Sequence, residues 1–282
     1  MSPHLLAEAR GFALETIRVL AWLAILAAIF VPLERLFALH RPTGRSKHAA
    51  SDVAFYFLNS LLPLAILAPP LAVLAAGLKL ATPQAYAAWV SGLPMWAKLA
   101  AGLAVGELGG YWGHRWCHEI PLLWRFHVLH HAPGHVNWLV SSRAHPVDQV
   151  FEKLCALAPL YVLGLVQPTA SGAGLAAGIA IFGTIWGFFI HANLRWRLGP
   201  LEWLVSTPAF HHWHHTNDAN RDRNYAALFP VVDRLFGTHH LPAHWPPEYG
   251  VDQPQPETMA EQLLRPLGFG GRAAGAPAAD AP

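Results

Sequence analysis

The sequence contains little charge. Only 13% of its 282 residues are acidic or basic, against roughly 25% in soluble domains, whereas 54% are hydrophobic. This composition predicts a membrane protein. The formal net charge is only +2 and the basic residues form no stripe, so we expect no nucleic-acid partner.

Cysteine is scarce as well. The two cysteines, Cys117 and Cys155, are too few for a disulfide framework, and neither belongs to a CxxC pair that would bind zinc or form a redox disulfide. We expect both thiols to pack against other side chains. Histidine, by contrast, is abundant and unevenly placed, because 15 of the 18 histidines lie between His114 and His244.

Long apolar segments predict an all-α fold, a polytopic membrane bundle of about four to five spans with a cytoplasmic helical cap. A helix of about 20 apolar residues crosses a hydrocarbon core of about 30 Å. In the second segment, Pro69 and Pro70 leave two alternatives open, one kinked span or a re-entrant pair. The last two segments predict a helical hairpin. The five segments are residues 12–36, 53–80, 95–113, 151–166 and 172–190.

The third apolar segment carries a glycine-rich face. Small residues let a second helix approach closely, so we expect this face to pack against another span. Glu107 lies on the same segment and should face the bundle, because a carboxylate in lipid is costly. The glycines are Gly102, Gly106, Gly109, Gly110 and Gly113.

Basic residues between the first two spans predict the orientation. The loop 39–48 carries Arg41, Arg45 and Lys47, and loops rich in lysine and arginine stay in the cytoplasm. If residues 53–80 cross once, the chain returns to the cytoplasmic side at His114, and the hairpin returns it there again at His191. We therefore expect every histidine cluster at the cytoplasmic face.

The chain divides into three predicted parts. Residues 1–50 hold the first span and the basic loop, and residues 51–250 form a membrane-embedded domain. Residues 251–282 contain QPQPE and GGRAAGAPAADAP, which have little to bury, so we expect a disordered tail.

Ten histidines are candidate metal ligands. Most are spaced three or four residues apart, and side chains at that spacing share one face of a helix. They are His114 and His118 in HRWCH, His127, His130 and His131 in HVLHH, His145 in RAHPVD, His191 at the end of the last apolar segment, and His211, His214 and His215 in FHHWHH.

Other histidines have ordinary interpretations beside a metal role. His145 precedes Pro146 and also fits the first turn of a helix, and His212 falls outside the spacing of its neighbours. The histidines in Pro- and Gly-rich loops are more typical of surface or hydrogen-bonding positions. These are His135, His239, His240 and His244.

The number of candidate ligands predicts two metal ions. Zinc takes three or four protein ligands, so ten histidines exceed the need of one ion. Without metal, burying an unpaired imidazole nitrogen costs about 1–3 kcal/mol, a cost that coordination removes. Imidazole binds iron, copper, zinc and nickel, so the residues leave the element open.

The motif series HRWCH, HVLHH, RAHPVD, HAN, PAFHHWHH, NYA and DRLFGT resembles the fatty acid hydroxylase or sterol desaturase superfamily, which are integral-membrane di-iron oxygenases. The resemblance covers roughly residues 30–240. It departs from the family at NYA, where NYG is more usual, and we see no fused cytochrome domain.

The resemblance implies a function. It implies that the histidine motifs and His191 hold two iron ions, with O2 as co-substrate and electrons from a separate redox carrier, a ferredoxin or a b-type cytochrome with its reductase. The reaction would hydroxylate or desaturate an unactivated C–H position of a lipid drawn from the bilayer. Sterol or hopanoid, fatty acyl, carotenoid and ether lipids all fit. Candidates for acids that orient the imidazoles are Glu119, Asp148, Asp218 and Asp222, each of which also fits an ordinary surface carboxylate.

Two other functions compete. A divalent-metal transporter would place its ligands within the spans near the bilayer midplane, whereas these histidines lie beyond the span ends. A membrane zinc hydrolase would need one site with about three histidines and a general base, and here the imidazoles are in surplus.

Overall fold

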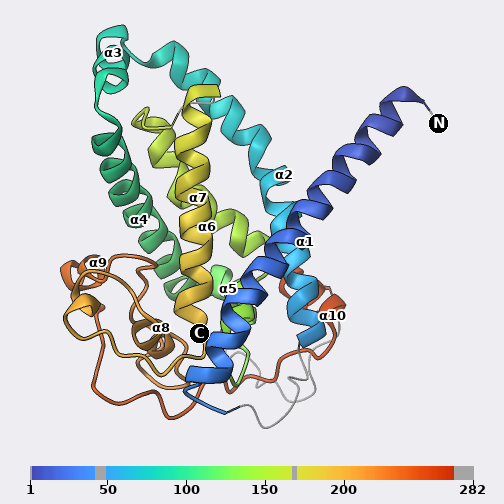
Figure 1. Ribbon diagram of the computed structural model, residues 1–282, viewed down its shortest axis with the longest axis vertical. Helices are drawn as coiled ribbons and strands as arrows, with labels where there is room; N and C mark the ends of the chain where they lie inside the picture. Colours follow the sequence, from blue (N-terminus) through green and yellow to red (C-terminus); the bar gives the residue numbers. More distant parts are fainter. Residues whose placement is uncertain (1, 42–48, 167–169, 270–282) are drawn as a thin grey trace, which may run out of the picture.

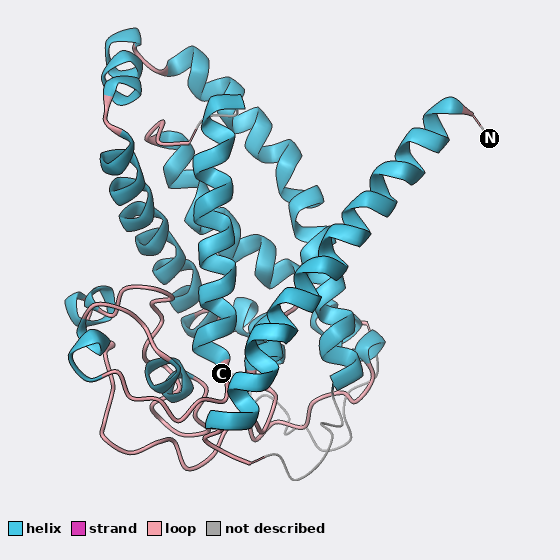
Figure 2. Ribbon diagram, viewed as in Figure 1, coloured by secondary structure: helices cyan, strands magenta, loops and turns pink. Residues whose placement is uncertain are grey.

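A computed structural model describes residues 2–41, 49–166 and 170–269. Within these ranges the chain is helical, and the only β-pairing consists of isolated bridges, Ala38 with Leu194 and Thr216 with Tyr249 (Figure 2). The predicted all-α fold class is therefore confirmed.

Long helices form a bundle (Figure 1). α1 and α2 are long and apolar enough to cross a membrane, and α3 with α4 adds a third candidate if the two, bent by 108°, count as one broken span. α6 and α7 are the predicted hairpin and run within the same bundle. Their bounds are Pro3–Phe37 for α1, Ala49–Ala81 for α2, Gln84–Gly92 for α3, Met95–Glu119 for α4, Pro146–Val162 for α6 and Ala170–His191 for α7.

The second apolar segment forms one bent helix. α2 continues through Pro63, Pro69 and Pro70, so of the two alternatives the described chain adopts the single kinked helix. The chain then alternates in direction, and the ends of α1, α4 and α7 gather with the starts of α2 and α6 at the lower end of Figure 1. All the histidine motifs follow or precede those ends, as the single-crossing alternative requires.

The glycine face of α4 packs against α6. A Cβ at Gly113 would lie 2.8 Å from the Cβ of Cys155, and one at Gly109 would overlap the Cys155 carbonyl. The prediction of a close helix contact is therefore confirmed. Cys117 and Cys155 are both free thiols.

Glu107 of α4 faces the protein, as expected. Its Oε1 accepts hydrogen bonds from the backbone N–H groups of Leu228 and Phe229, at 2.7 and 2.8 Å. This carboxylate therefore ties the long loop after α8 to the bundle.

Short elements form a cap at the histidine end. They are α5 (Pro121–His131), η1 (Trp138–Ser142), η2 (Gly199–Trp203), α8 (Pro208–His214), α9 (Val231–Leu235), α10 (Met259–Leu264) and η3 (Arg265–Leu267). A buried apolar cluster holds α1 to the cap, with Phe30 stacked on Trp138 at 6.0 Å between ring centroids.

The expected disorder of residues 251–282 is wrong for residues 259–267. The Thr258 hydroxyl accepts from the backbone N–H of Glu261 and so caps α10, and Gln262 is buried. Composition alone missed this helix because the contacts that hold it come from distant residues, such as the hydrogen bond from His145, at the start of α6, to the Leu263 carbonyl. Residues 270–282, and the basic loop residues Arg45 and Lys47, lie outside the described residues.

Candidate metal centre

Nine of the ten candidate ligands converge in two adjacent groups. Within each group, every histidine offers a ring nitrogen within 4.8 Å of those of its neighbours. We call them the five-histidine group and the four-histidine group. The first contains His114, His118, His127, His131 and His214, and the second contains His130, His191, His211 and His215.

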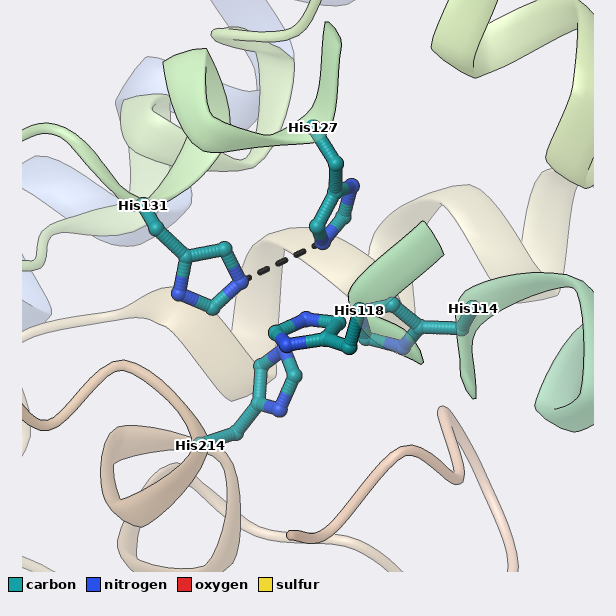
Figure 3. A group of neighbouring side chains, drawn as sticks. All are labelled: His114, His118, His127, His131 and His214. Atoms are coloured by element: carbon teal, nitrogen blue, oxygen red, sulfur yellow. Dashed lines mark hydrogen bonds between the residues drawn. The ribbon is translucent and has the colours of Figure 1, made fainter. Parts of the chain in front are cut away.

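The five-histidine group forms where α4 turns into α5. α4 ends at Glu119, Ile120 alone is extended, and Pro121 begins α5, so the chain turns at a single residue between the two helices. The last turns of α4 contact α5, and the ring centroids of His118 and His131 lie 4.7 Å apart. His214 enters from α8, and Figure 3 shows the five rings pointing toward one another.

The four-histidine group joins three helices. His130 comes from α5, His191 from the last residue of α7, and His211 from α8, with His215 directly after it. The Nε2 atom of His191 lies 3.1 Å from that of His130 and 2.9 Å from that of His211. Two imidazole nitrogens on one metal lie about 3.0 Å apart at a right angle, given metal–nitrogen bonds of about 2.1 Å.

The two groups touch. The rings of His131 and His215 stack with centroids 4.6 Å apart, and they belong to different groups. Each HxxHH motif serves both groups, because α5 gives His127 and His131 to one and His130 to the other. The arrangement therefore suits two neighbouring metal ions that share supporting helices.

The hydrogen bonds of two imidazole rings indicate that the site fits cations. His130 Nδ1 donates to the Arg143 carbonyl at 3.2 Å, and His191 Nδ1 donates to the Gly187 carbonyl at 2.6 Å. Both Nε2 atoms therefore carry no proton, and they face each other at 3.1 Å. Two opposed lone pairs repel unless a cation binds them, so this pair fits a metal ion.

Burial keeps the imidazoles neutral. It lowers the pKa of His131, His214 and His215 well below the usual value, and the neighbouring imidazoles lower it further. The Nε2 atoms of His118 and His214 are buried and have no hydrogen-bond partner among the described residues. Neutral rings with free lone pairs are the state that binds a metal ion.

Two acids orient rings of the five-histidine group. Asp222 Oδ1 lies 3.0 Å from His118 Nδ1, and both carboxylate oxygens of Asp148 lie 3.1 Å from His127 Nδ1. A carboxylate on Nδ1 fixes the tautomer and turns Nε2 toward the metal. Burial alone would lower the pKa of His127, but the Asp148 carboxylate raises it above its usual value.

The other two predicted acids lie elsewhere. Glu119 accepts from the Arg115 guanidinium at 2.7 Å, and Asp218 accepts from the backbone N–H of Asn220 at 2.7 Å. Neither forms a described hydrogen bond with a histidine of the two groups.

The fatty acid hydroxylase family model matches residues 99–238, the segment that contains both histidine groups. The chain belongs to the fatty acid hydroxylase family. Its apolar helices and this membership identify it as a membrane protein. No solved structure matches the chain significantly.

Proteins similar to this chain are named as enzymes that modify lipids. The chain is 33% identical to an ornithine lipid hydroxylase of Rhizobium tropici, over 65% of this chain and 54% of that protein. It is 35% identical to an alkylglycerol monooxygenase of Danio rerio, over 51% of this chain and 30% of that protein. A very-long-chain aldehyde decarbonylase of Oryza sativa subsp. indica is 32% identical, over 55% and 25% of the respective chains. The aligned part of this chain thus spans about half of the first relative and less of the others.

The NYA and DRLFGT motifs support α8 and one ligand. Asn224 adopts a left-handed conformation, with φ 56°, and its side-chain amide donates to the Phe210 carbonyl at 2.8 Å. The backbone N–H groups of Tyr225 and Ala226 donate to the carboxylate of Asp233. The Tyr225 carbonyl then accepts from His114 Nδ1 at 2.9 Å. From sequence, only the family resemblance pointed to these residues.

His145 is not brought into either group. Its Nδ1 accepts from the backbone N–H of Val147 at 3.1 Å and caps α6, so Nε2 carries the proton and donates to the Leu263 carbonyl at 3.0 Å. The RAHPVD motif instead contributes Asp148 and the Arg143 carbonyl, which hold His127 and His130.

His212 has a similar supporting role. Its Nε2 lies 3.1 Å from the Ala192 carbonyl, and its Nδ1 lies 3.0 Å from the Tyr249 hydroxyl. Because both nitrogens are engaged, His212 is outside both groups, as its spacing in the sequence indicates.

We expect His145→Asn to keep the full metal content of the protein. Asparagine preserves the helix cap of α6, and neither group loses a ring. Metal per chain, measured by plasma emission spectrometry on purified protein, should equal that of the parent. A loss of one ion would show that His145 is a ligand after all.

The metal-free protein should be least stable in acid. His131, His214 and His215 have folded pKa values below the ordinary 6.5, and burial lowers that of His212 to about 3. Below pH 6.5 the unfolded chain therefore binds more protons than the folded one, so stability is present above that pH and is lost as the pH falls. Melting of chelator-treated protein should drop by several degrees from pH 7.5 to 5.5. An unchanged melting temperature would contradict neutral, buried imidazoles.

Proposed function

We propose that the chain is a membrane-bound, O2-dependent di-iron oxidoreductase that hydroxylates or desaturates an unactivated C–H position of a lipid. The convergence of nine imidazoles into two touching groups supports this most directly. The relatives, named as lipid hydroxylase, alkylglycerol monooxygenase and aldehyde decarbonylase, support a lipid substrate and oxidative chemistry.

The five-histidine group would hold one iron ion and the four-histidine group the other. When bound, the two ions would supply O2 activation and removal of hydrogen from carbon. The chain itself supplies neutral nitrogen ligands, with Asp148, Asp222 and the backbone carbonyls of Arg143 and Tyr225 fixing ring orientation. The buried site also excludes water, which protects a reactive oxidant from side reactions.

The substrate would reach the site from the bilayer. The histidine groups lie at one end of the helix bundle (Figure 1), so a lipid needs to move its target carbon only from the membrane to that end. The ornithine lipid and alkylglycerol named in the relatives are the first substrates to test. Sterol or hopanoid, fatty acyl and carotenoid lipids remain candidates.

We propose that the histidine end faces the cytoplasm and that the chain crosses the membrane several times. Arg41, Arg195 and Arg197 lie at that end, next to the ends of α1 and α7, which fits the preference of basic residues for the cytoplasmic side. A separate ferredoxin, or a b-type cytochrome with its reductase, would deliver the electrons there.

A divalent-metal transporter and a zinc hydrolase fit less well. His114 and His118 lie in the last turns of α4 and His191 is the last residue of α7, so the ligands sit at helix ends and not midway along the spans. Two touching groups also exceed the single site of a zinc hydrolase.

Metal analysis combined with lipidomics tests the proposal. Purified protein should contain two iron ions per chain, and a deletion strain should lose one hydroxylated or unsaturated lipid that the gene restores. A single zinc ion per chain, or an unchanged lipid profile, would reject it.

A further inference from the structure

A cavity of about 250 Å³ lies between α5 and the segment 253–266. From α5 it is lined by Arg125, Val128 and Leu129. At about 100° per residue, these three positions share one face of the helix, and the three histidines of α5 share the opposite face. The cavity is therefore separate from the metal centre and lies behind the helix that carries it.

The cavity is positively charged. Arg125 and Arg265 both line it, and among the described residues that line it none is acidic. Arg265 Nη1 donates to the Pro254 carbonyl at 3.0 Å, and the Arg125 guanidinium lies 5.8 Å from the centre of the Phe126 ring. Neither forms an ion pair with a described carboxylate. Two guanidiniums without a counter-charge at one cavity indicate an anionic ligand.

Gln262, which lines the cavity, carries a buried acceptor. Gln262 is 2% exposed, and its Nε2 donates to the Pro256 carbonyl at 2.7 Å. Its Oε1 is buried and has no hydrogen-bond partner among the described residues. Buried polar atoms nearly always have partners, so this oxygen indicates a ligand that carries an O–H or N–H donor.

We propose that this cavity binds a phosphate ester whose alcohol or amine part carries a hydrogen-bond donor. The phosphate would bind Arg125 and Arg265, whose planar guanidiniums match its oxygens, and the donor would bind Gln262 Oε1. Free phosphate esters and phospholipid headgroups share this chemistry. The neighbouring Leu264, Leu267 and Phe269 are 47%, 49% and 63% exposed, and such apolar side chains beside basic residues suit a membrane surface. A phospholipid headgroup is therefore the favoured source.

Titration calorimetry on the full chain in non-ionic detergent tests the site. The probes are glycerol 1-phosphate, short-chain phosphatidylglycerol, and short-chain phosphatidylcholine, whose headgroup has no O–H or N–H donor. Saturable binding of phosphatidylglycerol alone supports a lipid source, and equal binding of glycerol 1-phosphate supports a free ester. Phosphatidylcholine should bind more weakly than phosphatidylglycerol, and equal binding would overturn the assigned role of Gln262.

Matched arginine variants locate the binding. Arg265→Gln and the exposed Arg125→Gln should each weaken binding by at least about tenfold, because each removes a charge-assisted contact. Arg195→Gln removes the same charge from an exposed position outside the cavity and should leave binding unchanged. Metal content and melting temperature show that each variant is folded. The proposal is overturned if neither glycerol 1-phosphate nor phosphatidylglycerol binds saturably, or if both cavity variants bind like the parent.

Discussion

His130→Ala should abolish lipid oxidation and lower the metal content by about one ion per chain. His130 is one of only four histidines in its group, and its Nε2 lies 3.1 Å from that of His191. Alanine removes a ligand and leaves no side chain that could replace it. Because even residues that only orient ligands change metal affinity or activity by about 10- to 100-fold, loss of a ligand should exceed about 100-fold.

His240→Ala is the control for this variant. The backbone N–H and carbonyl of His240 bond to the Asn224 side chain, and alanine keeps both contacts. The His240 ring packs against Trp213, outside both histidine groups. Metal content and turnover should stay near those of the parent. Equal losses in the two variants would mean that the histidines do not divide into ligands and supporting residues as the structure indicates.

Much of the site could be predicted because helical spacing is a local property. The offsets in HVLHH and FHHWHH placed side chains on shared faces, and the alternating spans placed those faces at one end of the bundle. Spacing does not determine which of the two metal ions each imidazole would bind, however. His130 and His131 are neighbours in sequence and belong to different groups, because His130 lies beside His191 at the end of α7, whereas His131 lies beside His118 of α4.

The errors and omissions arose where the decisive contact is distant in sequence. His145 lies in a motif typical of metal ligands, but its ring donates a hydrogen bond to the Leu263 carbonyl. Leu263 lies in the segment for which composition predicted disorder. Asn224 holds α8 through a left-handed backbone that no local pattern predicts. The span count also depends on geometry, since α3 and α4 form one candidate or none according to the 108° bend.

Asp148→Asn should weaken metal binding and turnover by about 10- to 100-fold while the nine imidazoles remain. Asp148 contacts His127 Nδ1 with both oxygens, and its side chain is only 1% exposed, so solvent does not screen its charge. Asparagine keeps the shape and one acceptor oxygen. It removes the negative charge that raises the pKa of His127 and that strengthens this imidazole as a ligand.

Two other acid-to-amide variants extend the prediction to a rank order of metal affinities. Asp222 contacts His118 Nδ1, but its side chain is 56% exposed, so water screens its charge and Asp222→Asn should have a smaller effect. Asp218→Asn should have none, because Asp218 bonds to the backbone of Asn220. Metal affinity, measured by competition with a chelator, should therefore fall most for Asp148, less for Asp222 and least for Asp218. If Asp148→Asn binds metal as tightly as Asp218→Asn, the buried carboxylate serves only packing, and the metal site depends on the imidazoles alone.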